Sequence, residues 1–218
     1  CGIASLDLIA QANSGVINWY DDINLQNLLD TGSIFTTPLL NNSTSYYAQS
    51  AYEFNAIHGG ASDNTIGNGG FYQGNHYMIF DVYIPSTLLS VLVYANTDGY
   101  RTIELRNSNN TIILDTTVFI SASSNGYRVN LNFDLPVQSD LQLGVSGINN
   151  DLYRNNSGAI FPYQIGNNIS VTAASNQSIQ DNWYFFYDWE VSKQSCQSNI
   201  LEVFAIINNT SSTTNANS

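Results

Sequence analysis

Apolar and polar residues alternate strictly along the segment from Tyr127 to Leu135, where every second residue is apolar. Successive side chains of a β-strand point to opposite faces, so this pattern predicts a strand with one buried and one solvated face. Comparable strand-like segments precede and follow it, at residues 77–84, 88–94, 102–106, 111–120, 141–145, 169–173 and 183–191. Eight such segments joined by long loops predict a jelly roll or a related two-sheet sandwich.

A second group of strands is expected outside this region. Residues 3–10, 16–20, 33–37 and 45–54 are separated by turn signals about every ten residues, and the matching last strand is expected only at 200–207. This spacing is typical of a β-sandwich. Aromatic residues make up 12% of the chain and charged residues 10%, which also favours an all-β fold over a helical one.

The two cysteines, Cys1 and Cys196, stand almost a whole chain apart, each beside an expected strand. We interpret them as one disulfide in an oxidising compartment. Closing so long a loop would stabilise the fold by roughly 4–5 kcal/mol in the chain-entropy model. The alternative is two unrelated buried thiols.

Several short motifs carry a resemblance to a known family. They are Cys1, the run from Gly15 to Asp21, the run from Thr31 to Pro38, the run from Ser43 to Tyr47, and Cys196-Gln197-Ser198 before a strand. Together they resemble the Ig-like modules repeated in large secreted Bacteroidetes proteins, which often use the type IX secretion route. In ordinary members the Tyr-Tyr strand leads almost directly to the second cysteine, whereas here about 140 residues intervene. The resemblance implies a guest inserted in an Ig-like module.

The expected organisation is therefore an all-β chain in which an Ig-like β-sandwich is interrupted by an inserted jelly-roll-like β-sandwich. Residues 1–55 form the first part of the Ig-like sandwich, 56–190 the insert, 191–207 the last Ig-like strand, and 208–218 a polar linker. The insert resembles a secreted module of the same bacteria through Leu92-Val93-Tyr94-Ala95-Asn96 and the run from Tyr184 to Glu190. That resemblance implies a secreted or cell-surface setting and no particular activity.

The charge of the chain narrows the possible partners. Seventeen acidic and five basic residues give a formal net charge of −12, which argues against nucleic acid because phosphate binding needs clustered cations. Anionic glycans are disfavoured for the same reason, unless a local arginine pocket overrides it. No apolar run is long enough to span a membrane. Without an initiator Met or a signal peptide, the sequence is expected to be a processed or excerpted part of a longer polypeptide.

Catalysis is not predicted. The histidines, His58 and His76, stand in unrelated contexts without a nucleophile motif. Asp188 and Glu190 could in principle form a glycosidase pair, but their spacing places both on one wet strand face, whereas such pairs face each other across a cleft. A solvated strand face is the favoured interpretation.

Glycan binding has better support, because sugar rings stack on aromatic side chains while amides and guanidinium groups bond their hydroxyls. The best candidate is the loop holding Tyr153, Arg154 and Asn155, followed by Tyr163. Trp183 and Arg101 belong to two further clusters. The competing interpretation is that these residues are part of the scaffold.

Calcium is a possible ligand of the glycine-rich loop that contains Asp63 and Asn64, since oxygen ligands from such loops often hold Ca²⁺ between strands. One carboxylate is few for such a site, and a flexible glycine loop is the alternative. No other cofactor is expected.

Two hypotheses about function follow. In the first, the chain is a non-catalytic extracellular module that binds polysaccharide or adheres to a surface glycan on behalf of a larger secreted or cell-surface protein. In the second, it is a structural repeat of a stalk or filament that contacts neighbouring modules.

Overall fold

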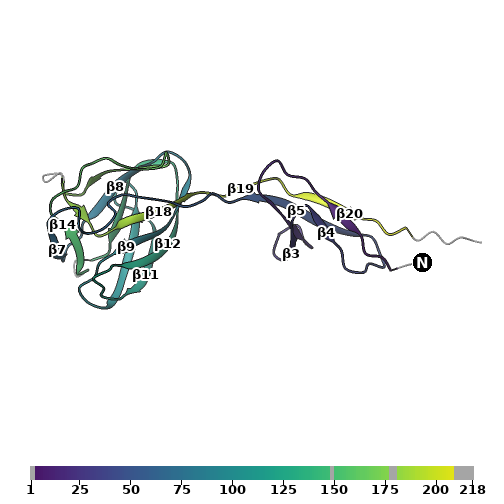
Figure 1. Ribbon diagram of the computed structural model, residues 1–218, viewed down its shortest axis with the longest axis horizontal. Helices are drawn as coiled ribbons and strands as arrows, with labels where there is room; N and C mark the ends of the chain where they lie inside the picture. Colours follow the sequence, from purple (N-terminus) through teal and green to yellow (C-terminus); the bar gives the residue numbers. More distant parts are fainter. Residues whose placement is uncertain (1–2, 148–149, 177–180, 209–218) are drawn as a thin grey trace, which may run out of the picture. The chain divides into compact units, whose positions relative to one another are not determined.

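A computed structural model describes residues 3–147, 150–176 and 181–208. In this part of the chain all regular structure is β-strand, and no helix is long and apolar enough to cross a membrane. The chain divides into two compact units (Figure 1). We call Cys1–Glu53 with Ser195–Ser218 the split unit and Phe54–Gln194 the continuous unit.

The split unit holds two small sheets. One has the order β19-β5-β2-β3, with β20 also paired to β5, and the other is β1-β4. The strands are β1 (Asp7–Ile9), β2 (Val16–Tyr20), β3 (Leu28–Thr31), β4 (Ile34–Thr36), β5 (Thr44–Tyr52), β19 (Cys196–Gln197) and β20 (Leu201–Ala205). Trp19 is fully buried, stacks on Phe35 at 5.7 Å, and donates its indole N–H to the Gly32 carbonyl. Trp19 is thus part of the apolar core of the split unit.

The chain leaves and re-enters the split unit at neighbouring points. Cys196 lies opposite Tyr52, and Gln197 lies opposite Ala51, in the antiparallel pair β19-β5. The strand that precedes the continuous unit and the strand that follows it are therefore hydrogen-bonded neighbours. The last strand, β20, returns to the same β5, with Leu201 opposite Ala48.

The predicted disulfide is only half inside the described residues. Cys196 is exposed on β19, whereas Cys1 lies outside the described residues. The pairing of Cys1 with Cys196 therefore stays a prediction.

The continuous unit holds three sheets. Their orders are β11-β10-β13-β8-β16-β15, β12-β9-β18-β6 and β17-β14-β7. The strands are β6 (Ile57–Gly59), β7 (Gly69–Tyr72), β8 (Tyr77–Val82), β9 (Ser86–Val93), β10 (Gly99–Arg106), β11 (Ile112–Ile120), β12 (Tyr127–Leu135), β13 (Gln138–Val145), β14 (Leu152–Asn155), β15 (Tyr163–Ile165), β16 (Ile169–Ala174), β17 (Trp183–Tyr184) and β18 (Tyr187–Lys193).

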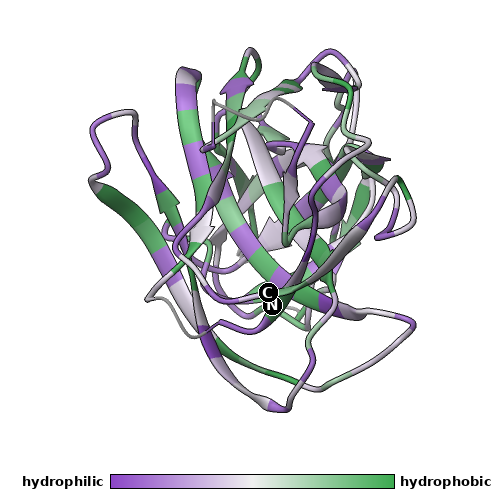
Figure 2. Cartoon of the chain, turned by 90° about the vertical axis from the view of Figure 1, so that its left-hand side faces the viewer, coloured by the Kyte–Doolittle hydropathy of each residue, from purple (hydrophilic) through white to green (hydrophobic). Residues whose placement is uncertain are grey.

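The strongest alternation in the sequence becomes β12, with the predicted bounds. Its apolar residues Val129, Leu131 and Phe133 are buried, whereas Asn130 and Asn132 between them are exposed. The same exchange of hydrophobic and hydrophilic residues is visible along other strands in Figure 2. One apolar cluster, built from all three sheets, forms the core of the continuous unit.

One expected strand is divided. The segment predicted at 183–191 forms β17 and β18, because Phe185 between them adopts a positive φ angle of 69°. The turn between the two strands is fixed from inside the core: the indole N–H groups of Trp183 and Trp189 both donate to the Phe186 carbonyl, at 2.7 and 2.9 Å. Period-two alternation could not show this turn, since every residue from 183 to 187 is buried.

Candidate functional site

The expected binding loop at 151–156 is largely a strand. Leu152–Asn155 forms β14, the central strand of the three-stranded sheet between β7 and β17. Neighbouring residues of a strand point to opposite faces. Arg154 pairs with Gly70 and Tyr184, whereas Tyr153 pairs with Phe71. The predicted site residues are therefore divided between two faces of one sheet.

Asn155 does not face solvent, which corrects its prediction as a ligand residue. Its side chain is fully buried, and its amide donates to the carbonyls of Asn64 at 2.9 Å and Gly67 at 2.8 Å. Its side-chain oxygen accepts from the Tyr187 hydroxyl at 2.8 Å. These three bonds fasten the glycine-rich loop to the core, so Asn155 belongs to the scaffold.

Arg101 and Trp183 are also buried, and for them too the scaffold interpretation holds. The Arg101 guanidinium donates to the carbonyls of Asn150 at 2.6 Å, Thr97 at 2.8 Å and Gly99 at 3.0 Å. Trp183 is fully buried. Both side chains are thus buried in the fold, where they bond or pack against its interior.

Tyr153 and Tyr163 are half-buried edges of the aromatic core. The Tyr153 ring contacts Phe71 and Tyr94 edge to face, at centroid distances of 5.5 and 6.4 Å. Tyr163 packs 4.8 Å from Trp183, and its hydroxyl accepts the Ile160 N–H. Since both rings already pack against the core, they are poorly placed to present a flat face to a sugar.

Arg154 differs from the other predicted residues because its charged group is available. The guanidinium carbon lies 4.2 Å from the ring centroid of Tyr72 and 5.8 Å from that of Tyr184. The side chain is half-buried and makes no hydrogen bond or ion pair with a described residue. Stacking therefore holds the guanidinium in place, while its N–H donors have no acceptor in the described part of the chain.

His76 completes this cluster. Its ring stacks on Tyr184 at 4.3 Å, its Nδ1 lies 2.8 Å from the Ser175 hydroxyl, and its Nε2 lies 3.3 Å from the Tyr72 hydroxyl. Burial and the nearby Arg154 charge lower the pKa of His76, so it is neutral at pH 7. We call Tyr72, His76, Arg154 and Tyr184 the β14 cluster.

The sequence analysis did not pair two exposed aromatic residues of the six-stranded sheet, one of which is the neighbour of Arg101 in its candidate cluster. Tyr100 on β10 lies opposite Phe119 on β11, and their rings meet edge to face at 5.2 Å. The two side chains are 75% and 45% exposed. The signal was present: strand alternation that buries Arg101 must turn Tyr100 outward. The choice of Arg101 over its neighbour selected the wrong face of the strand.

Polar groups continue along the same face of β10. Thr102 shares a 2.7 Å hydrogen bond with Thr117, its partner on β11. Glu104 and Arg106 follow at the next two outward positions, and they form a buried ion pair. We call Tyr100, Phe119, Thr102 and Thr117 the β10–β11 face.

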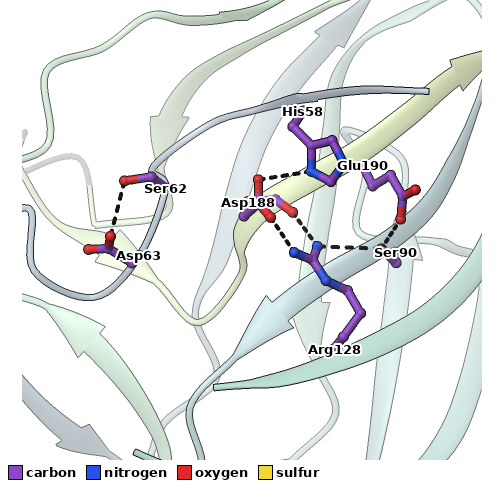
Figure 3. A network of polar contacts seen from close by, with 7 residues as sticks. All are labelled: His58, Ser62, Asp63, Ser90, Arg128, Asp188 and Glu190. Atoms are coloured by element: carbon purple, nitrogen blue, oxygen red, sulfur yellow. Dashed lines mark hydrogen bonds and ion pairs between the residues drawn. The ribbon is translucent and has the colours of Figure 1, made fainter. Parts of the chain in front are cut away.

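A separate polar network covers the four-stranded sheet (Figure 3). Asp188 on β18 forms an ion pair with Arg128 on β12 and lies 3.0 Å from Nδ1 of His58 on β6. The Ser90 hydroxyl donates to Glu190 at 2.5 Å. Burial raises the pKa of Asp188, but the hydrogen bonds from Arg128 and His58 outweigh it and hold the pKa below its usual value.

This network lacks the geometry of nucleophilic catalysis. The Ser90 hydroxyl bonds Glu190 and not His58, so serine and histidine do not form a nucleophile–base pair. Asp188 and Glu190 lie on one strand, as predicted, and both bond neighbouring side chains of the same sheet (Figure 3). The arrangement fits a solvated strand face.

The glycine-rich loop is held by hydrogen bonds of its own. The Asp63 carboxylate accepts from the backbone N–H and the hydroxyl of Thr65, at 2.8 and 2.6 Å, which lowers the pKa of Asp63. The Asn64 carbonyl accepts from Asn155. Among the residues that the structure describes, no three His, Cys, Asp or Glu side chains form a group that could hold a metal ion. Calcium at Asp63 and Asn64 stays a prediction.

A comparison with known protein families found a match for the first part of the chain. A family model described as an Ig-like domain, CHU_C associated, matches residues 1–56. The match ends close to Glu53, where the chain leaves the split unit. It supports an Ig-like module of the Bacteroidetes type and indicates an extracellular or cell-surface protein. The comparisons with curated proteins and with solved structures found no match.

Proposed function

We propose that the chain is a non-catalytic carbohydrate-binding or adhesive module of a larger secreted or cell-surface protein. The observation that carries the proposal is the β10–β11 face, where two exposed aromatic rings stand beside a pair of threonine hydroxyls. Sugars offer apolar C–H faces to such rings and hydroxyl groups to such side chains. Exposed apolar patches rimmed by polar groups commonly mark binding surfaces.

The proposal includes a nested architecture. We propose that the continuous unit is a jelly-roll-like sandwich inserted into the Ig-like module. Three facts support this: the two units have separate apolar cores, the family match ends near Glu53, and the ends of the split unit meet in the pair β19-β5. In such an arrangement the Ig-like module links the insert to neighbouring parts of the polypeptide.

A glycan array probed with the whole chain tests the function. Tyr100→Ala and Phe119→Ala should each weaken binding by about tenfold or more, which is the usual loss for a contact residue at a binding hot spot. Both rings are solvent-exposed, so the fold should survive. Tyr83→Ala is the matched control, because Tyr83 is 54% exposed and lies outside this face. Equal binding by all three variants would contradict the proposal.

A second candidate is a structural repeat that contacts neighbouring modules. It is favoured by β11, an edge strand whose ladder in the described residues runs only to β10 and whose Ile112 and Leu114 are exposed. Exposed apolar edge strands readily pair with other chains. Light scattering separates the candidates: self-association that Phe119→Ala abolishes, without glycan binding, would favour the structural repeat.

A further inference from the structure

We propose that the β14 cluster is a second binding site, in which Arg154 receives the carboxylate of an acidic sugar. This site is distinct from the β10–β11 face, and it selects ligands by charge. The choice of a sugar as the carrier of the carboxylate rests on the function proposed above. The choice of a carboxylate rests on Arg154 and its surroundings alone.

The basic residues differ in their partners, and all five lie in the described part of the chain. Arg101 donates to backbone carbonyls, Arg106 pairs with Glu104, and Arg128 pairs with Asp188. The remaining cation besides Arg154 is Lys193, whose ammonium lies 5.4 Å from the Phe54 ring. Arg154 is thus the arginine whose guanidinium has no acceptor among the described residues.

The lack of an acidic partner is informative in this chain. Seventeen acidic residues stand against five basic ones, so an arginine has many potential partners. In the described residues no carboxylate lies within ion-pair distance of Arg154. The segments outside that part, residues 1–2, 148–149, 177–180 and 209–218, contain no Asp or Glu. The Arg154 charge therefore has no Asp or Glu side chain to neutralise it.

The Arg154 side chain is preorganised. Its guanidinium carbon lies 4.2 Å from the ring centroid of Tyr72 and 5.8 Å from that of Tyr184. Two aromatic contacts limit the rotamers of the side chain, so less entropy is lost when its donors bind an acceptor. Tyr72 is itself held, since its hydroxyl lies 3.3 Å from Nε2 of His76.

The sheet face that carries Arg154 is accessible. Gly70 lies directly opposite Arg154 in the ladder, so both present the same face of the sheet. Among the described residues, no heavy atom lies within 4 Å of the position that a Cβ at Gly70 would occupy. The face is therefore uncovered at Gly70, and the Arg154 side chain is only half-buried.

The chemistry of the site matches one carboxylate. An arginine fork meets the two oxygens of a carboxylate with two parallel hydrogen bonds. His76 is neutral, and both of its ring nitrogens already have partners, so the site carries a single positive charge. A single charge in a chain of net charge −12 suits a monoanion better than a phosphate dianion. A hexuronic acid in a polysaccharide is such a group.

Calorimetry on the whole chain with an oligomer of galacturonic acid tests the inference, with its fully methyl-esterified form as the neutral analogue and polyglutamate as the acidic peptide. We expect the acid oligomer to bind and the ester to bind at least about tenfold more weakly. Arg154→Gln should weaken binding of the acid oligomer by a similar factor, because the charged bidentate pair is lost. Tyr83→Ala, at an exposed residue outside both surfaces, should leave this binding unchanged.

Two further variants keep the result interpretable. Should Arg154→Gln reduce the unfolding midpoint, Arg154→Lys retains the charge but not the fork, and it should still weaken binding. Tyr72→Phe keeps the aromatic ring under the guanidinium and removes only the hydroxyl contact with His76, so it should weaken binding less than Arg154→Gln does.

The other outcomes overturn the inference in distinguishable ways. Equal binding of acid and ester, unaffected by Arg154→Gln, would refute the carboxylate site while leaving glycan binding by the chain intact. Binding of polyglutamate through Arg154 without binding of the acid oligomer would make the ligand an acidic peptide. Failure of all three probes to bind would refute the site, whereas the array result at Tyr100 and Phe119 would still decide the proposed function separately.

Discussion

Asn155 offers the sharpest test of whether a predicted ligand residue belongs to the scaffold. Its fully buried side chain makes three hydrogen bonds, two of them to the carbonyls of Asn64 and Gly67 and one from the Tyr187 hydroxyl. Asn155→Ala removes all three at once. If Asn155 were a surface ligand residue, the same substitution would change binding and leave stability almost unchanged.

The expected loss of stability follows from the number of bonds. A typical hydrogen bond contributes about 1 kcal/mol net, so three of them give about 3 kcal/mol. The substitution also leaves the carbonyls of Asn64 and Gly67 and the Tyr187 hydroxyl without that partner, and stranded buried polar groups cost about 1–3 kcal/mol each. Some of this cost is offset where water enters. We expect the free energy of unfolding to fall by about 3–5 kcal/mol.

Urea denaturation followed by tryptophan fluorescence measures this loss, because Trp183 and Trp189 are buried in the continuous unit. The control is Asn156→Ala at the adjacent position, where the side chain is exposed and a change within about 0.5 kcal/mol is expected. A loss below about 1 kcal/mol for Asn155→Ala, or equal losses for both variants, would refute the scaffold account.

Three further predictions concern charge, the disulfide and the nested units. Arg128→Met should lower the free energy of unfolding by about 1 kcal/mol at pH 7. The pKa of Asp188 is lower in the folded protein than in the unfolded chain, so the ion pair stabilises the fold at pH values above the unfolded pKa, and the difference between the variants should shrink as the pH falls below about 4 and Asp188 becomes protonated. A difference that does not change with pH would contradict the ion pair. Intact-mass analysis after alkylation without reductant should find no reactive thiol at Cys1 or Cys196, whereas two alkylated cysteines would exclude the disulfide. Deleting Phe54–Gln194 and joining the ends with a short turn should leave a folded small sandwich, since those ends meet in one antiparallel pair; circular dichroism without cooperative unfolding would count against the nested architecture.

The sequence by itself determined most of the strands. Strict alternation gave the bounds of β12 directly, and the all-β character followed from spacing and turn signals. The short strands β3, β6, β7, β14, β15 and β19 were missed, because two to four residues are too few for a period to show. Their existence depends on pairing with strands that are distant in sequence, such as Arg154 with Gly70.

Only the tertiary structure decided which of the predicted side chains reach solvent. Aromatic residues, arginine and asparagine can bind a ligand at the surface or hold the fold together from inside. Which role a residue has depends on which face of its strand the core covers. Arg101 and Asn155 face carbonyls inside the fold, whereas Tyr100 and Arg154, each one residue away, do not. A one-residue step reverses the face of a strand, so composition could locate these clusters, while only the folded sheet could divide them into scaffold and surface.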